Sequence, residues 1–222
     1  MNLTHLLKYV FPQGFTITRK DCCFGGGGIF LAVSSEFPFL DVSINTDAEM
    51  IWVKITPIYG ETLFICSFYR PPDGNIKPVE DLKSTLLSLG LATNCNNNII
   101  IAGDFNFPSI VWDDGIGYVE PNPTYGREIN SLFLDIINEF GLEQQVNEYT
   151  RGNHILDIVL SSQPHTISNV STVPGMSDHE AVSFEVLIKL GRYKLEPRKI
   201  YQFHKANKEV IIAEVHKFAV IF

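Results

Sequence analysis

The chain has 222 residues, of which 45% are hydrophobic and 19% charged, a balance typical of one globular domain with or without a tail. It contains no apolar run near the ~20 residues that a membrane-spanning helix needs, and Met1–Phe11 lacks the basic start and long apolar stretch of a secretory signal. We therefore expect an intracellular protein, nuclear or cytoplasmic, that has no membrane partner. None of the four cysteines stands in a Cys-x-x-Cys pair, which argues against a zinc site.

The net charge of -8 is unevenly distributed along the chain. Residues 1–188 contain 9 Lys and Arg against 22 Asp and Glu, whereas residues 189–222 contain 8 against 3. This change in composition predicts a domain over residues 1–188, followed by a basic linker or tail over 189–222. An acidic body binds a phosphate backbone poorly unless metal ions or local basic patches intervene.

The first half of the chain has mainly strand patterns. Apolar runs and period-2 alternation predict four strands, and apolar spacing after a proline predicts one helix. The strands are expected at Ile29–Val33, Ile51–Ile55, Thr62–Tyr69 and Asn98–Ala102, and the helix at Pro78–Leu91. The glycine run Gly25–Gly28 lacks the Gly-Lys-Ser/Thr ending of a phosphate-binding loop, so we interpret it as a turn.

The second half mixes helix and strand patterns. Apolar residues at helical spacing predict a helix over Ile129–Phe140, which Gly141 would end. Further elements are expected as strands at Ile155–Leu160, Ser168–Val173 and Ala181–Ile188, and as a helix at Lys205–Phe222. Strands and helices intermingle throughout, which predicts a layered α/β fold with sheets inside and helices outside.

A first polar cluster follows the predicted strand Asn98–Ala102, in the sequence Gly-Asp-Phe-Asn. In an extended chain, residues two apart point the same way, so Asp104 and Asn106 would share one face just past the strand end. Ligands of α/β sheets tend to bind at such strand ends. A simple Asx turn explains the same residues and stays open as the alternative.

Two further polar clusters follow later in the chain. One contains a carboxylate within an apolar run, and the other contains a histidine at the start of a predicted strand. Asp157 lies within the apolar run Ile155–Leu160 and would need a His, an Arg or a metal ion as partner, unless it lies at an exposed strand edge. His179 follows Asp178 directly before an alternating strand pattern. Such a histidine can act in acid–base chemistry or donate to a transition state, although a lone histidine is more often structural.

Taken together and in this order, Gly-Asp-Phe-Asn, Leu-Asp and Ser-Asp-His resemble the endonuclease/exonuclease/phosphatase superfamily. The resemblance runs from about Thr4 to Ile188, and Phe68–Pro72 is similar to a strand end in the endonuclease domains of LINE-type, jockey-like retrotransposons. The segment Arg198–Ala206 resembles the link from that domain towards a reverse transcriptase, whose own sequence is not part of this chain. The resemblance implies a four-layer α/β sandwich of two packed mixed β-sheets flanked by helices.

The resemblance also implies a metal-dependent nuclease that nicks DNA, with Mg²⁺ or Mn²⁺ as cofactor and the DNA backbone as partner. Asp104 would orient or deprotonate the attacking water, and Asn106 would position water and phosphate. His179 would stabilise the transition state while Asp157 orients its ring. The remaining implied roles are metal binding by Asp178 and Asp104, a phosphate contact from the hydroxyl of Tyr69, and a less direct substrate contact from Thr150.

The chain departs from the family pattern at its start. Relatives have a first strand that bears an Asn, and then a metal-binding Glu; Leu3 stands at the position of that Glu in this sequence. We therefore expect an N-terminally truncated domain, and the activity of this chain stays open. The alternatives are a phosphomonoesterase of the same fold, or a non-catalytic relict or interaction domain.

Overall fold

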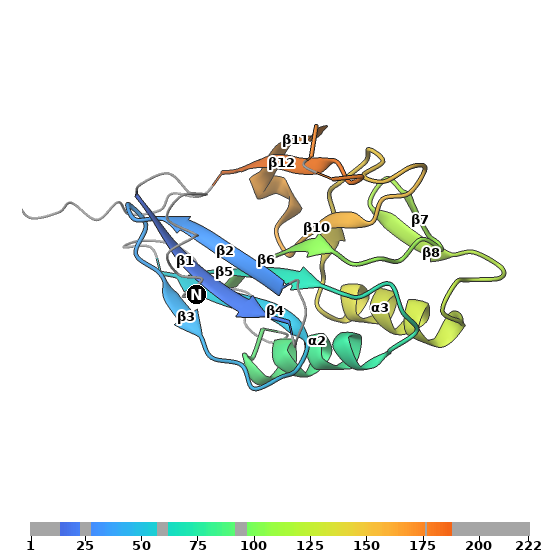
Figure 1. Ribbon diagram of the computed structural model, residues 1–222, viewed down its shortest axis with the longest axis horizontal. Helices are drawn as coiled ribbons and strands as arrows, with labels where there is room; N and C mark the ends of the chain where they lie inside the picture. Colours follow the sequence, from blue (N-terminus) through green and yellow to red (C-terminus); the bar gives the residue numbers. More distant parts are fainter. Residues whose placement is uncertain (1–13, 23–27, 57–61, 92–96, 176, 188–222) are drawn as a thin grey trace, which may run out of the picture. The chain divides into compact units, whose positions relative to one another are not determined.

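The structure is a computed structural model, and it describes residues 14–22, 28–56, 62–91, 97–175 and 177–187. Two α-helices, twelve strands and one short 3-10 helix, η1 Pro164–Thr166, are found in these residues (Figure 1). The strands are β1 Phe15–Asp21, β2 Gly28–Ser34, β3 Leu40–Val42, β4 Glu49–Ile55, β5 Thr62–Tyr69, β6 Asn97–Asp104, β7 Ile110–Asp113, β8 Ile116–Val119, β9 Glu143–Gln144, β10 Asp157–Ser161, β11 Ile167–Val173 and β12 Ala181–Val186. The helices are α2 Lys77–Ser88 and α3 Arg127–Glu139. Neither helix is long and apolar enough to cross a membrane.

The central sheet has six strands in the order β3-β4-β5-β6-β10-β9. Only β5 and β6 run parallel in this sheet, and α2 lies between them in the chain, whereas the other neighbours pair antiparallel. Two parallel neighbouring strands need such a crossover connection, because a tight turn reverses the chain and can join only antiparallel strands. The sheet is therefore mixed.

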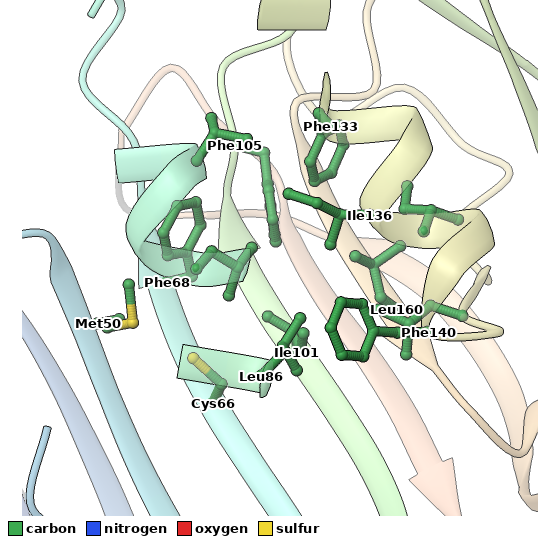
Figure 2. Close-up of a cluster of buried hydrophobic side chains, with 14 of the residues drawn as sticks. Met50, Cys66, Phe68, Leu86, Ile101, Phe105, Phe133, Ile136, Phe140 and Leu160 are labelled. Carbon is green, nitrogen blue, oxygen red and sulfur yellow. The ribbon is translucent and has the colours of Figure 1, made fainter. Parts of the chain in front are cut away.

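Alternation along these strands divides the core into two parts. One face of the sheet packs against α2 and α3 through side chains such as Phe68, Ile101 and Leu160, which meet Leu86 and Phe133 from the helices (Figure 2). The opposite face forms a second apolar cluster, built from Ile55, Leu63, Ile100, Val146 and Val159.

Two antiparallel ribbons lie on this opposite face. β1 pairs with β2, and both lie against β4 while β2 also lies against β5; β11 pairs with β12, which lies against β10 (Figure 1). Side chains such as Val182 and Phe184 cover the second cluster. The layered α/β fold is confirmed; in the part of the chain that the structure describes, the second β-layer consists of these two ribbons and not of one mixed sheet.

Most predicted elements are confirmed, with shifts of a few residues at their ends. The helix expected at Pro78–Leu91 ends at Ser88, and β10 begins at Asp157, two residues later than expected. Gly141 has a left-handed backbone (φ 59°) directly after the end of α3, as expected of a helix-ending glycine. The expected helix at Lys205–Phe222, most of the glycine run Gly25–Gly28 and the proposed tail lie outside the described residues.

Candidate active site

Four polar side chains from four neighbouring strands form one row across the end of the central sheet. Strand pairing places Glu49 opposite Tyr69, Tyr69 beside Asp104, and Asp104 opposite Asp157. Directly paired residues point to the same face of a sheet. Since Asp157 is two residues from Val159, this is the face of the second apolar cluster, away from the helices. The register of the sheet therefore gathers the site.

Asp104 and Asn106 contact each other through a tight turn. The backbone N–H of Asn106 donates to Asp104 Oδ1 (3.1 Å), and its side-chain Nδ2 donates to Asp104 Oδ2 (2.8 Å) and to the carbonyl of Arg70 (2.9 Å). This is the Asx turn that the sequence left open, and Asn106 has a left-handed backbone (φ 52°) where an extended one was expected. Asn106 is 4% exposed, and both its amide hydrogens are used within the protein, so it holds the carboxylate of Asp104.

Gly103 explains how the strand can bring Asp104 to this position. Its φ is 149°, and a Cβ atom there would lie 1.9 Å from the carbonyl oxygen of Phe68 on β5. No side chain fits at that distance, so only glycine allows β5 and β6 to approach closely at this point. Asp104 therefore follows directly after the point at which the backbones of β5 and β6 are in close contact.

His179 and Asp157 form the central hydrogen bond of the site. Asp157 Oδ2 accepts from His179 Nδ1 at 2.7 Å, and the two side chains are 22% and 18% exposed. The backbone N–H of Asp157 donates to the buried hydroxyl of Thr150 (3.0 Å), as does that of Leu156 (2.9 Å). The backbone N–H of His179 donates to Ser177 Oγ (3.2 Å). Thr150 is fully buried and holds the start of β10 through these hydrogen bonds, and its expected substrate contact stays a prediction.

The surroundings of the row raise the pKa of two of its side chains, Asp104 and Tyr69. Burial, with the neighbouring charge of Asp157, raises the pKa of Asp104 from 3.8 to about 6, although His179 and the hydrogen bonds from Asn106 oppose the rise. Burial and then the negative charges of Asp104 and Glu49 raise the pKa of the Tyr69 phenol. A carboxyl with a pKa near neutrality suits proton transfer, and a phenol with a raised pKa stays a hydrogen-bond donor.

Three of these groups are close enough to share an ion. Ligand atoms of Asp104, Asp157 and His179 all lie within 4.8 Å of one another. Burial and the charge of Asp157 raise the pKa of Asp104 even though His179 opposes the rise, and the charge of a divalent cation would lower it. Carboxylate oxygens are the ligands that Mg²⁺ prefers, so the two aspartates fit such an ion.

Asp178 is placed differently from the other predicted residues. Its side chain is 66% exposed and forms an ion pair with Arg151 (2.6 Å), and it is not among the three clustered groups. Burial opposes the change, but a hydrogen bond from the backbone of Asp178 itself and then the charge and hydrogen bond of Arg151 lower the pKa of the Asp178 carboxyl. The expected metal contact of Asp178 therefore stays a prediction.

Sequence reasoning missed Glu49 and the contacts of Arg70. Glu49 Oε2 is buried and makes no hydrogen bond within the described residues, although it stands in the same row as Tyr69. The only signal for Glu49 was a carboxylate at the start of the alternating strand Ile51–Ile55. Arg70 was noted as part of a motif, and its burial could not be expected because arginine is rarely buried.

Comparisons with solved structures support this description of the fold. An AP endonuclease from Archaeoglobus fulgidus is 16% identical, with a TM-score of 0.57 over 82% of this chain and 85% of that one. An endonuclease/exonuclease/phosphatase family protein from Leptotrichia buccalis is 15% identical, with a TM-score of 0.53 over 83% and 75% of the two chains. Fold and site together define the class as the endonuclease/exonuclease/phosphatase superfamily.

A model of the family described as endonuclease–reverse transcriptase matches residues 63–183, more than half of the chain. The chain belongs to this family. The match contains all the predicted site residues, from Tyr69 to His179. A search of curated proteins found no match.

Proposed function

We propose that this chain is a divalent-metal-dependent phosphodiester hydrolase that nicks DNA. The observation that carries the proposal is the hydrogen bond between His179 and Asp157, made beside the carboxylate of Asp104. A histidine oriented by a partly buried carboxylate, next to a second carboxyl group with a pKa near neutrality, is suited to hydrolysis. The family's description as an endonuclease supports a nucleic acid as the substrate.

In this proposal Asp104 is the general base. It takes a proton from water, whose oxygen attacks phosphorus while the bond from phosphorus to the leaving oxygen breaks and that oxygen gains a proton. Asn106 holds the carboxylate of Asp104 in place through its two hydrogen bonds. In the metal-free protein the pKa of Asp104 is about 6, so the carboxylate is largely ionised at neutral pH and still able to accept a proton.

His179 and Tyr69 stabilise the negative charge that develops on the phosphate. Because Nδ1 of His179 donates to Asp157, Nε2 is the nitrogen left for a phosphate oxygen, and it donates there when the ring carries both protons. Tyr69 keeps its proton at neutral pH, because burial and nearby carboxylates raise its pKa, so its hydroxyl can donate as well. Donors aimed at developing charge are commonly a large part of catalysis.

The carboxylates of Asp104 and Asp157 would hold the metal ion. Bound Mg²⁺ or Mn²⁺ would supply positive charge that offsets the repulsion between these carboxylates and the phosphodiester. The residue types support a hard cation of this kind.

The source of the chain is part of the proposal. The motif Phe68–Pro72 and the segment Arg198–Ala206 favour a reading frame derived from a LINE-type retrotransposon, in which a reverse transcriptase domain would belong to the full-length product. Such a protein would act inside the cell, in the nucleus or cytoplasm, where DNA is available.

A supercoiled-plasmid nicking assay with Mg²⁺ tests the proposal. We expect His179→Ala to lower the rate by about 100-fold or more, as for the loss of a general acid or base. His165→Ala, which removes an exposed histidine outside the site, is the matched control and should nick at the wild-type rate. Hydrolysis of a phosphomonoester in place of the plasmid would favour the phosphatase alternative. An equal rate for His179→Ala and wild type would refute the assigned site.

A further inference from the structure

Arg70 has a charged side chain with no exposed surface, directly after β5. Its Nε donates to the carbonyl of Phe105 at 2.7 Å, and its Nη1 donates to the carbonyl of Asp73 at 2.6 Å. Burying a charge is costly unless hydrogen bonds and other favourable contacts offset the loss of water. Here carbonyl oxygens and aromatic faces take the place of water.

Two aromatic rings complete the surroundings of the guanidinium. Its Cζ lies 4.3 Å from the ring centroid of Phe107 and 4.8 Å from that of Tyr125. A planar guanidinium suits such rings and presents several N–H donors in fixed directions at once, which a lysine ammonium does not. Burial lowers the pKa of Arg70, but nearby tyrosine and aspartate groups oppose the change.

The same arginine contacts every residue of the turn from Asp104 to Asn106. Its backbone N–H donates to the carbonyl of Asp104 (2.9 Å), and its Nη2 donates to the carbonyl of Asn106. The carbonyl of Arg70 in turn accepts from Nδ2 of Asn106 (2.9 Å), the amide that also holds the carboxylate of Asp104. Without the guanidinium, the carbonyls of Phe105 and Asn106 would lose donors while Asn106 stays in its left-handed conformation.

We propose that Arg70 is a positioning residue for the hydrolysis: its guanidinium holds the turn at Asn106, and thereby sets the direction of the Asp104 carboxylate. The expected effect on the rate of hydrolysis rests on the proposed function, whereas the effect of Arg70 on the turn does not. Arg70 is inaccessible to a substrate, so it acts through the turn and contributes to the rate through geometry. A misplacement of about 1 Å at a reacting group can cost about 100-fold in rate.

The first measurement needs no activity. In wild-type protein, the side-chain N–H groups of Arg70 should exchange slowly with solvent and give separate signals by NMR, unlike those of the exposed Arg127. The side-chain amide of Asn106 should be protected from exchange in the wild type and lose that protection in Arg70→Met. Rapid exchange at Arg70 in the wild type, or a protected Asn106 amide in Arg70→Met, would overturn the proposal.

The second measurement separates positioning from general stability. Phe133→Leu is the matched control, because the Phe133 ring stacks on Phe107 (4.6 Å) and contacts Phe105 (5.1 Å) but has no polar group that could donate to the carbonyls that Arg70 holds. With all variants shown to be folded at the assay temperature, Arg70→Met should lower kcat about 100-fold with KM changed less than about threefold. Phe133→Leu should lower the melting temperature but keep kcat within about threefold.

Arg70→Lys gives an independent result if Arg70→Met does not fold. It keeps the charge but can supply fewer of the hydrogen bonds, so kcat should fall between those of wild type and Arg70→Met. Equal kcat losses in an Arg70 variant and Phe133→Leu would show a merely structural role and overturn the inference. If wild type nicks no DNA, the proposed function fails, and the exchange of the Asn106 amide still decides whether Arg70 positions the turn.

Discussion

Replacing Asp157 with Asn should lower the pKa of Asp104 in the metal-free protein. The pKa of Asp104 is about 6, some two units above its ordinary value of 3.8. Burial is the largest cause and the charge of Asp157 is the next, so removing that charge should take away part of the rise. The expected fall is on the order of one unit. Asn keeps the shape of Asp157, and its amide oxygen can still accept from His179 Nδ1.

The assay is a carboxyl ¹³C NMR titration between about pH 3 and pH 9, with a chelator present. Asp113→Asn, which removes an exposed carboxylate of β7, is the matched control and should leave the titration of Asp104 unchanged. His179→Ala should raise the pKa of Asp104 further, because the charge of His179 opposes the rise. A wild-type Asp104 that titrates near pH 4, or an unchanged pKa in Asp157→Asn, would refute the argument.

The same shift predicts how stability changes with pH. A carboxyl whose pKa is raised by folding stabilises the folded state below its unfolded pKa, near 3.8, and loses that contribution as the pH rises through about 6. Two units correspond to nearly 3 kcal/mol, and partial exposure of Asp104 reduces this to about 1 kcal/mol. Urea unfolding of metal-free protein should detect this loss between pH 4 and pH 7, and added Mg²⁺ should restore it at pH 7.

Three further substitutions test contacts around the site. Gly103→Ala should destabilise by about 3 kcal/mol or more, because its methyl group would meet the carbonyl of Phe68; a fully stable variant in urea unfolding would contradict this. Thr150→Val should cost about 2–4 kcal/mol in urea unfolding, since two buried N–H groups lose their acceptor, whereas Thr150→Ser should cost much less. Arg151→Met should lower the free energy of unfolding by less than about 1 kcal/mol, because the ion pair between Arg151 and Asp178 is exposed. A larger loss in thermal melting would contradict this small contribution of the ion pair.

Continuous apolar runs and period-2 alternation allowed the central strands to be predicted, and apolar residues at helical spacing allowed both helices to be predicted. The strands β5, β6 and β10 lie in the interior of the sheet, so their side chains are apolar on both faces and the pattern is visible locally. The strands β1 and β3, the ribbon β7–β8 and the two-residue strand β9 were not predicted. Their pairing depends on partners elsewhere in the chain, and a short, partly exposed strand has little pattern of its own.

The candidate site could be predicted as a set of residue types but not as a set of contacts. The motifs around Asp104, Asp157 and His179 indicated a hydrolytic site, whereas the hydrogen bond between Asp157 and His179 spans 22 residues of sequence and follows from tertiary packing. Local chemistry could not decide between an extended segment and an Asx turn at Asn106. Contacts with Arg70 stabilise the turn, and no periodic pattern in the sequence predicts that Arg70 is buried.

The row of site residues ties function to the register of the sheet. Side chains alternate between faces, so a slip of one residue between β5 and β6 would turn Asp104 towards the helices. Such a slip would also move the buried Ile101 to the other face, so the apolar pattern of the core opposes it. Gly103 opposes it too, because a residue with a side chain would then lie against the carbonyl of Phe68. The packing that stabilises the domain is therefore the same packing that aligns the four polar side chains.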